Sequence, residues 1–269
     1  MPAESSTSAS AFAILSIHKN DSLRFLQFPD DIHTNIQPVI LATWPLGIQS
    51  SGPYAESYQH KLKGKPFGWT NEQEVVGGFR VMRNVLAFLH EQSWQLVTPL
   101  VCSRKHGAKD TLIFRRRPLD AGPPVPMDWL AVALMGSDRL RVVYDAKDVK
   151  LSGGADSDHD HLGVLISGLK KALEAMDCFQ KGDWSYDSFE FKLKGRPWLS
   201  QGEDVVKSRL LLLRIVETLD SSGWRSCCSV LQRTGNDDFR MADTWYFMRP
   251  RTQAGGGNET ASLPRPGAA

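Results

Sequence analysis

The sequence lacks most of the features from which a function is commonly read. Its 269 residues contain four cysteines, and none of them forms a CxxC pair or stands at zinc-ligand spacing from a histidine. This cysteine usage is typical of a reducing compartment. No apolar run approaches the ~20 residues that span a bilayer, and no basic residue precedes the first short apolar run. We therefore expect a soluble, cytoplasmic protein without a membrane span.

An excess of charge of one sign is also missing. The 32 Lys and Arg residues nearly balance the 30 Asp and Glu residues, which leaves a formal net charge of +2. No global field therefore directs the chain to nucleic acid or to an acidic membrane. P-loop, GxSxG and strand–helix GxGxxG elements are absent. We predict no catalytic residue, cofactor or metal, although catalytic groups that assemble from distant positions leave an enzyme open as an alternative.

What the sequence does contain is an internal repeat. The heptapeptide KLKGKPF at 61–67 recurs as KLKGRPW at 192–198, with five of seven positions identical. Further matches follow in the same order, and the spacing between the copies drifts only slowly, as loop insertions in a duplicated chain produce. These matches are 21–24 with 138–141, Trp94 with Trp224, and 110–116 with 243–249. The sequence therefore predicts an α+β protein built as a tandem duplication with pseudo-twofold symmetry.

Each copy predicts the element order ββαβαββ, a mixed sheet with two helices packed on it. Strands 58–63 and 189–194 alternate aromatic or apolar residues with lysine, which indicates one core face and one solvent face. The second helix of copy two is apolar over most of its circumference, so we expect helix 205–219 to pack against the other copy as well. The expected boundaries are a disordered N-terminus at 1–10, unit 1 at 11–117, a proline-rich linker at 118–127, unit 2 at 128–249 and a disordered tail at 250–269.

Two resemblances accompany these patterns. The last strand–helix–strand–strand of each copy resembles the βαββ module found twice in GyrI-like and SOUL/haem-binding proteins. That resemblance implies a small-molecule groove between duplicated halves. The duplicated KLKGxP(F/W) motif is similar to one in an uncharacterised fungal protein family, which implies no activity.

The repeated motif supplies the candidate binding residues. Cations stand on and just beyond the solvent-facing strand edge of both copies, and such clusters bind phosphate or acidic peptides. The competing interpretation is a solvated strand face whose lysines discourage edge pairing. The candidates are Lys61, Lys63, Lys65, Lys192, Lys194 and Arg196, together with Trp198 and His60.

Two of the candidate features occur in one copy alone. His60 takes the core-face position that Phe191 holds in copy two. A histidine there is either a hydrogen-bonded core residue or a residue that lines a pocket and titrates near neutrality. The acidic stretch 156–161, with Asp156, Asp158, Asp160 and His161, has metal-ligand chemistry but fails the EF-hand pattern, so we interpret it as a solvated loop.

The leading hypothesis is a non-enzymatic binding or scaffold protein. Its ligand or partner, an anionic small molecule or a protein, lies in a groove between the two units near the lysine pairs. Two alternatives stay open. One is an enzyme on a small acidic substrate with His60 as acid or base, and the other is a binder of nucleic acid or anionic lipid.

Overall fold

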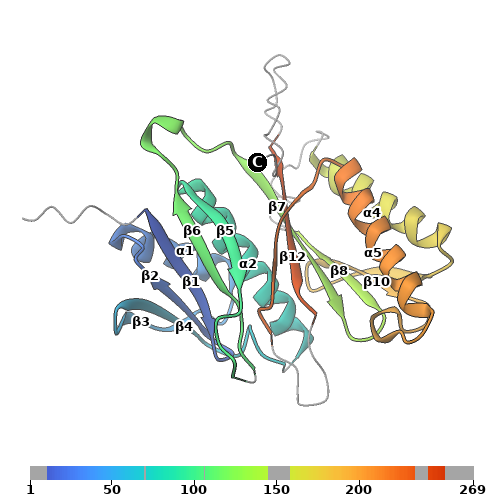
Figure 1. Cartoon of the computed structure of the whole chain (residues 1–269), viewed down its shortest axis with the longest axis horizontal. Helices are drawn as coiled ribbons and strands as arrows, with labels where there is room; N and C mark the ends of the chain where they lie inside the picture. Colours follow the sequence, from blue (N-terminus) through green and yellow to red (C-terminus); the bar gives the residue numbers. More distant parts are fainter. Residues whose placement is uncertain (1–10, 70, 106, 145–157, 234–241, 252–269) are drawn as a thin grey trace, which may run out of the picture.

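The structure, a computed structural model, describes residues 11–69, 71–105, 107–144, 158–233 and 242–251 (Figure 1). The acidic stretch 156–161 lies outside the described side chains, as do the N-terminus and most of the tail. Unit 1 comprises β1 (Phe12–His18), β2 (Ser22–Leu26), α1 (Asp30–Thr43), β3 (Ile48–Tyr54), β4 (Ser57–Leu62), α2 (Glu72–Glu91), β5 (Trp94–Leu100) and β6 (Thr111–Arg116). After a short 3-10 turn, η1 (Leu119–Ala121), unit 2 comprises β7 (Met127–Met135), β8 (Arg139–Val143), α4 (Asp158–Ala175), β9 (Phe179–Ser185), β10 (Ser188–Leu193), η2 (Pro197–Leu199), α5 (Asp204–Ser221), β11 (Arg225–Val230) and β12 (Thr244–Pro250).

The two units have the same topology, so the predicted α+β tandem duplication is confirmed. Unit 1 forms a six-stranded sheet in the order β3-β4-β2-β1-β6-β5, and unit 2 forms one in the equivalent order β9-β10-β8-β7-β12-β11. The pairing registers coincide as well: Arg24 lies opposite Gln59, and Arg141 lies opposite Glu190. Even a break in register recurs, next to Lys61 in unit 1 and Lys192 in unit 2.

Each unit contains one strand more than the predicted order, which becomes ββαββαββ, and every pairing is antiparallel instead of mixed. The additional strands, β3 and β9, lie at sheet edges and are mostly exposed. An edge strand without a buried face shows no alternation of apolar residues. The sequences IQSSGPY and FQKGDWS therefore resemble loops until their partner strands are known.

The units are arranged head to tail instead of by the predicted pseudo-twofold. Helix α2 lies between the two sheets and packs on β7 and β8 of unit 2, while α4 and α5 cover the opposite face of that sheet (Figure 1). The sheet of unit 2 is therefore buried on both faces, which explains the near-continuous apolar sequence of β7. In β1 buried residues alternate with partly exposed ones, because no layer of the described chain covers the outer face of the unit 1 sheet.

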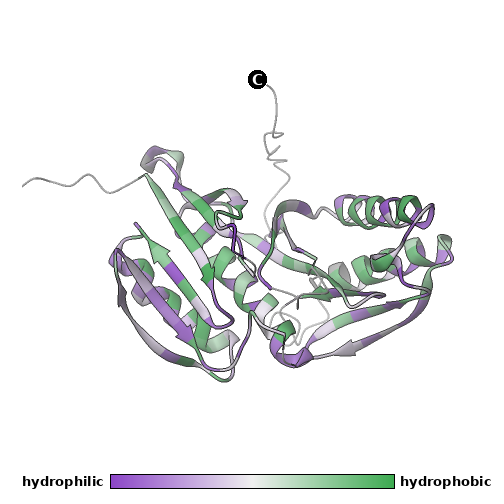
Figure 2. Ribbon diagram, turned by 60° about the horizontal axis from the view of Figure 1, so that its bottom comes forward, coloured by the Kyte–Doolittle hydropathy of each residue, from purple (hydrophilic) through white to green (hydrophobic). Residues whose placement is uncertain are grey.

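The packing of the second helices reverses our expectation. Helix α2, not helix 205–219, contacts both units, and its buried residues belong to the same apolar cluster as Trp129 and Tyr246 of unit 2. Helix α5 buries one face only, with Leu211, Ile215 and Leu219 on its own sheet. Figure 2 shows hydrophobic residues mixed with hydrophilic ones on these outer helices. None of the described helices is long and apolar enough to cross a membrane.

Candidate functional site

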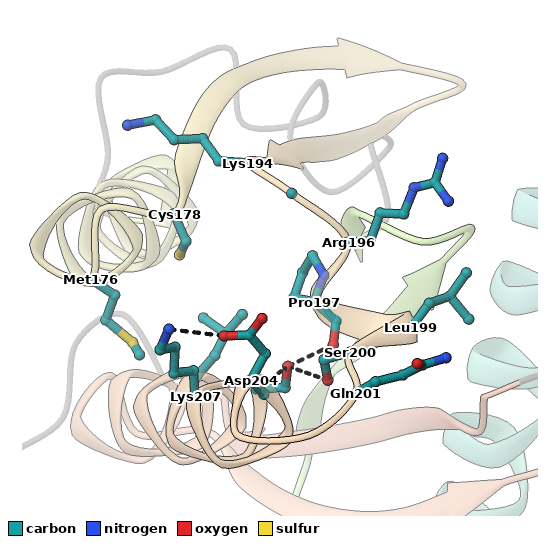
Figure 3. Close-up of a pocket in the computed structure, with 13 residues that line it drawn as sticks. Met176, Cys178, Lys194, Arg196, Pro197, Leu199, Ser200, Gln201, Asp204 and Lys207 are labelled. Atoms are coloured by element: carbon teal, nitrogen blue, oxygen red, sulfur yellow. Dashed lines mark hydrogen bonds and ion pairs between the residues drawn. The ribbon is translucent and has the colours of Figure 1, made fainter.

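A pocket of about 510 Å³ opens within unit 2 (Figure 3). It lies among the C-terminal end of α4, the turn that follows β10, and the first turns of α5. Its volume falls within the ~300–1,000 Å³ of ordinary small-molecule sites. The lining residues are Met176, Cys178, Lys194, Gly195, Arg196, Pro197, Leu199, Ser200, Gln201, Asp204, Lys207, Ser208 and Leu211.

The walls of this pocket combine an apolar floor with a polar rim. Leu211 and Met176 supply apolar surface below, and the buried Ser208 hydroxyl donates to the Pro197 carbonyl oxygen at 2.7 Å, which ties α5 to the turn. At the rim the Lys207 ammonium donates to the Asp204 carboxylate at 2.8 Å (Figure 3). Both groups of this pair are exposed, so the pair contributes little to stability and is free to exchange partners.

The remaining polar side chains at the pocket differ in what they offer. Burial raises the pKa of the Cys178 thiol, whose sulfur donates to the Leu173 carbonyl at 3.3 Å, so it presents a neutral surface instead of a thiolate nucleophile. Lys194 and Arg196 contribute their backbone to the wall but extend their side chains away from the centre (Figure 3). The Lys194 ammonium pairs with Asp177 at 2.5 Å.

In unit 1 a tryptophan occupies the corresponding place. The Trp44 side chain is only 3% exposed and donates from Nε1 to the Lys63 carbonyl at 2.8 Å. A Cβ on Gly77 would lie 2.5 Å from the indole ring, so the helix needs glycine there for the ring to fit. The repeat aligns Lys63 with Lys194 and Gly77 with Lys207 of the pocket. What is a filled slot in unit 1 is therefore an open one in unit 2.

Two backbone groups of the turn have side-chain hydrogen-bond partners in unit 1, but their equivalents in the described part of unit 2 do not. The Glu74 carboxylate accepts from the Lys65 N–H at 2.7 Å, and the indole donates to the preceding carbonyl of the same turn. Within the part of unit 2 that the structure describes, neither the Lys194 carbonyl nor the Arg196 N–H has a hydrogen-bond partner. The glycine between them, Gly195, has no atom within 4 Å of an added Cβ. The pocket thus presents one acceptor and one donor at fixed spacing.

The predicted lysine pairs do not share a groove. Lys61 lies on the outer face of the unit 1 sheet, where its ammonium is 4.0 Å from Asp21. Lys192 lies on the face of the unit 2 sheet that is turned toward unit 1, where it pairs with Asp138. The unit 1 sheet and helix α2 separate these faces, because α2 packs between the two sheets. Lys63 and Lys65 are exposed at the end of β4.

A smaller cavity of about 210 Å³ does lie between the units, beside Arg83 and Trp129. The predicted lysines are not among the residues that line it. The Arg83 guanidinium donates to the Trp129 carbonyl at 3.0 Å and thereby ties α2 to β7. Apolar residues of both units form one buried cluster beside this cavity, which includes Val81 and Leu86 of α2 and Trp129 of β7.

His60 is fully buried within an aromatic cluster. Its Nδ1 is 2.8 Å from the Ser51 hydroxyl, its ring packs against Tyr58 and Phe25, and its Nε2 has no partner among the described residues. Burial lowers the pKa of the imidazole to about 4. The serine–histidine contact resembles half of a nucleophile–base pair, but the structure places no carboxylate on the free nitrogen to orient the ring. Trp198, in contrast, is half-buried and donates to the Arg139 carbonyl at 2.9 Å.

An ionic network at the junction of the units was not anticipated from the sequence. The Arg141 side chain is completely buried and binds the carboxylates of Glu190 and of Glu72, the first residue of α2. Arg139 also binds Glu72, at 2.8 Å. Only the repeat hinted at it, since Arg24 and Gln59 hold the equivalent positions in unit 1 and are themselves hydrogen-bonded at 2.8 Å.

Comparison with known proteins places the chain in a family without assigning an activity. A family model of an uncharacterised domain matches twice, over residues 11–115 and 128–248, which together exceed half of the chain. No curated protein and no solved structure matches. The likeness of each unit to GyrI-like and SOUL proteins, and the identity of the family that carries the lysine motif, therefore stay predictions. The chain belongs to this family of uncharacterised domains and carries two copies of its domain.

Proposed function

We propose that the chain is a non-enzymatic binding protein whose ligand occupies the unit 2 pocket. One observation carries this proposal: the same fold holds a buried indole at this place in unit 1 and leaves it open in unit 2. The filled slot of unit 1 supports a planar aromatic ligand, which in unit 2 lies farther from the helix because Lys207 stands at the position of Gly77. A pocket of about 510 Å³ with an apolar floor and a polar rim has the size of a small-molecule site.

The contacts in unit 1 specify the chemistry of the ligand. The indole N–H of Trp44 donates to a carbonyl, and the carboxylate of Glu74 accepts from the N–H two residues later. A ligand that replaces both groups donates to the Lys194 carbonyl and accepts from the Arg196 N–H. We therefore infer a planar aromatic ring that bears an N–H donor and a carboxylate, the class of indole carboxylic acids.

The charges around the pocket favour an anion as well. Lys207 stands at the rim, and its carboxylate partner Asp204 is an exposed side chain that a ligand carboxylate displaces at little cost. The ammonium and the backbone N–H then bind the same anionic group from two sides. Because the pair is exposed, salt screens this contribution, so affinity falls as ionic strength rises.

Calorimetric titration with indole carboxylates at low and moderate salt tests the proposal. We expect saturable binding by the wild type, weaker binding by the Lys207→Glu variant, and none by Cys178→Trp, which places a ring in the pocket. The exposed Cys102, which is not among the pocket residues, provides the matched control Cys102→Trp, which should bind as the wild type does. Failure of the wild type to bind any member of the class, or equal binding by Cys178→Trp, refutes the proposal.

A further inference from the structure

Helix α5 presents an apolar stripe to the outside of unit 2. The stripe consists of Val206, Leu210, Leu213 and Val216, which are 62%, 49%, 57% and 40% exposed. Their spacing places all of them on one helix face, opposite the face that Leu211 and its neighbours bury against the sheet. A contiguous exposed apolar surface of this kind is typical of a site of protein association.

The repeat shows what such a face packs against. In α2 the equivalent positions are Val76, Arg80, Arg83 and Leu86, of which three are buried. That face of α2 lies on the unit 2 sheet, where the Arg83 guanidinium donates to the Trp129 carbonyl. Next to it Arg80 donates to the carbonyls of Tyr186 and Asp187 at 2.8 and 3.0 Å. In unit 1, the second helix of the fold therefore uses this face to pack on the sheet of the other unit.

The other sheet also has an outer face that no helix among the described residues covers. The outer face of the unit 1 sheet includes Phe12, which is 51% exposed, with partly exposed aliphatic residues beside it. The pairing registers assign these residues the positions that the α2-binding residues hold in unit 2. Phe12, Ile14, Leu26 and Ile113 correspond to Trp129, Ala131, Val143 and Tyr246. The exposed helix stripe and the exposed sheet face thus repeat the two halves of the interface within the chain.

Charges at one end of the two surfaces are complementary. Within the chain, Arg141 on the sheet binds Glu72 at the start of α2. The unit 1 sheet carries the half-buried Arg24 at the position of Arg141. Its guanidinium carbon lies 3.7 Å from the centroid of the Tyr54 ring, and its Nε donates to the Gln59 side-chain oxygen. The start of α5 carries Glu203, which is exposed. When α5 lies on the unit 1 sheet as α2 lies on the unit 2 sheet, Glu203 comes to the same end of the interface as Arg24.

We propose that a second copy of this chain occupies the stripe, with α5 of one copy on the outer unit 1 sheet of the next. The contact is heterologous, so it continues the head-to-tail stacking of the units and leaves one free face at each end of the assembly. Polar residues stand at the sheet positions of Ser16 and His18, where unit 2 has Ala133 and Met135. The contact is therefore weaker than the one within the chain, and association is reversible and depends on concentration.

Sedimentation velocity of the full chain over a series of concentrations tests this proposal. We expect the weight-average mass to rise above the monomer mass of 30.0 kDa as concentration increases. Leu213→Glu on the helix and Phe12→Glu on the sheet should each abolish the rise. Leu41→Glu, a change at an exposed leucine on α1, is the control and should leave the rise unchanged. A wild type that stays monomeric throughout overturns the proposal.

Mixing the two variants distinguishes head-to-tail contact from symmetric pairing of helices. The Leu213→Glu variant keeps its sheet face, and the Phe12→Glu variant keeps its helix stripe. The mixture should therefore form a capped dimer with twice the monomer mass and nothing larger, while each variant alone stays monomeric. Dimers of the Phe12→Glu variant alone would indicate α5-to-α5 pairing and refute the proposal. A wild-type-like rise in both single variants would also refute it, because the contact would then use neither surface.

Discussion

Replacing Trp44 tests whether the indole is what closes the pocket site in unit 1. The side chain is 3% exposed, and truncation of a buried tryptophan to alanine removes about 3–5 kcal/mol of unfolding free energy. This loss includes its hydrogen bond to the Lys63 carbonyl. Trp44→Phe keeps a ring but loses the donor, so it should cost less, about 1–3 kcal/mol. The exposed Trp69 supplies the control, since Trp69→Ala should stay within about 1 kcal/mol.

Urea denaturation of the three variants measures these costs, and added indole then tests the identity of the site. Indole at 100 times its dissociation constant stabilises a protein by about 2.7 kcal/mol. We expect Trp44→Ala to gain more stability from indole than the wild type, because the variant has two open sites instead of one. Two results would contradict this assignment of the slot: a Trp44→Ala cost no greater than that of Trp69→Ala, or equal stabilisation of Trp44→Ala and the wild type by indole. Should Trp44→Ala fail to fold, Trp44→Phe against Trp69→Phe keeps the comparison.

Three further predictions concern stability. Burial lowers the pKa of His60 in the folded protein from 6.5 to about 4. The contribution of the neutral imidazole to the unfolding free energy is therefore complete above about pH 6.5 and is lost as pH falls toward 4. His60→Phe should remove about 3 kcal/mol of the difference in unfolding free energy between pH 7 and pH 4, as chemical denaturation at both pH values would show; an unchanged difference contradicts it. Glu72→Ala takes a carboxylate from a buried arginine and should cost about 1–3 kcal/mol, whereas the exposed Glu203→Ala should stay within about 0.5 kcal/mol at dilute concentration. Leu211→Ala should lower the unfolding free energy by about 2–5 kcal/mol in urea denaturation, because Leu211 is buried. A loss as small as that of Glu203→Ala would contradict the burial of Leu211.

The duplication and most of the helices and strands could be predicted from the sequence alone. A heptapeptide repeated at matched spacing indicates two copies of one fold, and the alternation of apolar and charged residues in β10 identifies its core face and its opposite face. Strands β3 and β9 could not be predicted in this way, because an edge strand that buries no face has no alternation of apolar and polar residues. The sequence also identified the turn after β10 as a place of interest, although for its lysines instead of its backbone.

Which surfaces are buried between layers depends on the packing of the two units and could not be predicted from the sequence. Helices α2 and α5 both have apolar residues on two faces. Among the described residues a second sheet packs on α2 but not on α5, so α2 is buried on both faces and α5 on one. The pocket depends on the same level of structure. Trp44 and Gly77 are 33 positions apart, and their fit, or its absence in unit 2, arises only when the helices pack. The periodicity of a sequence indicates which face of a helix or strand is buried. Which other element covers that face depends on how the layers pack.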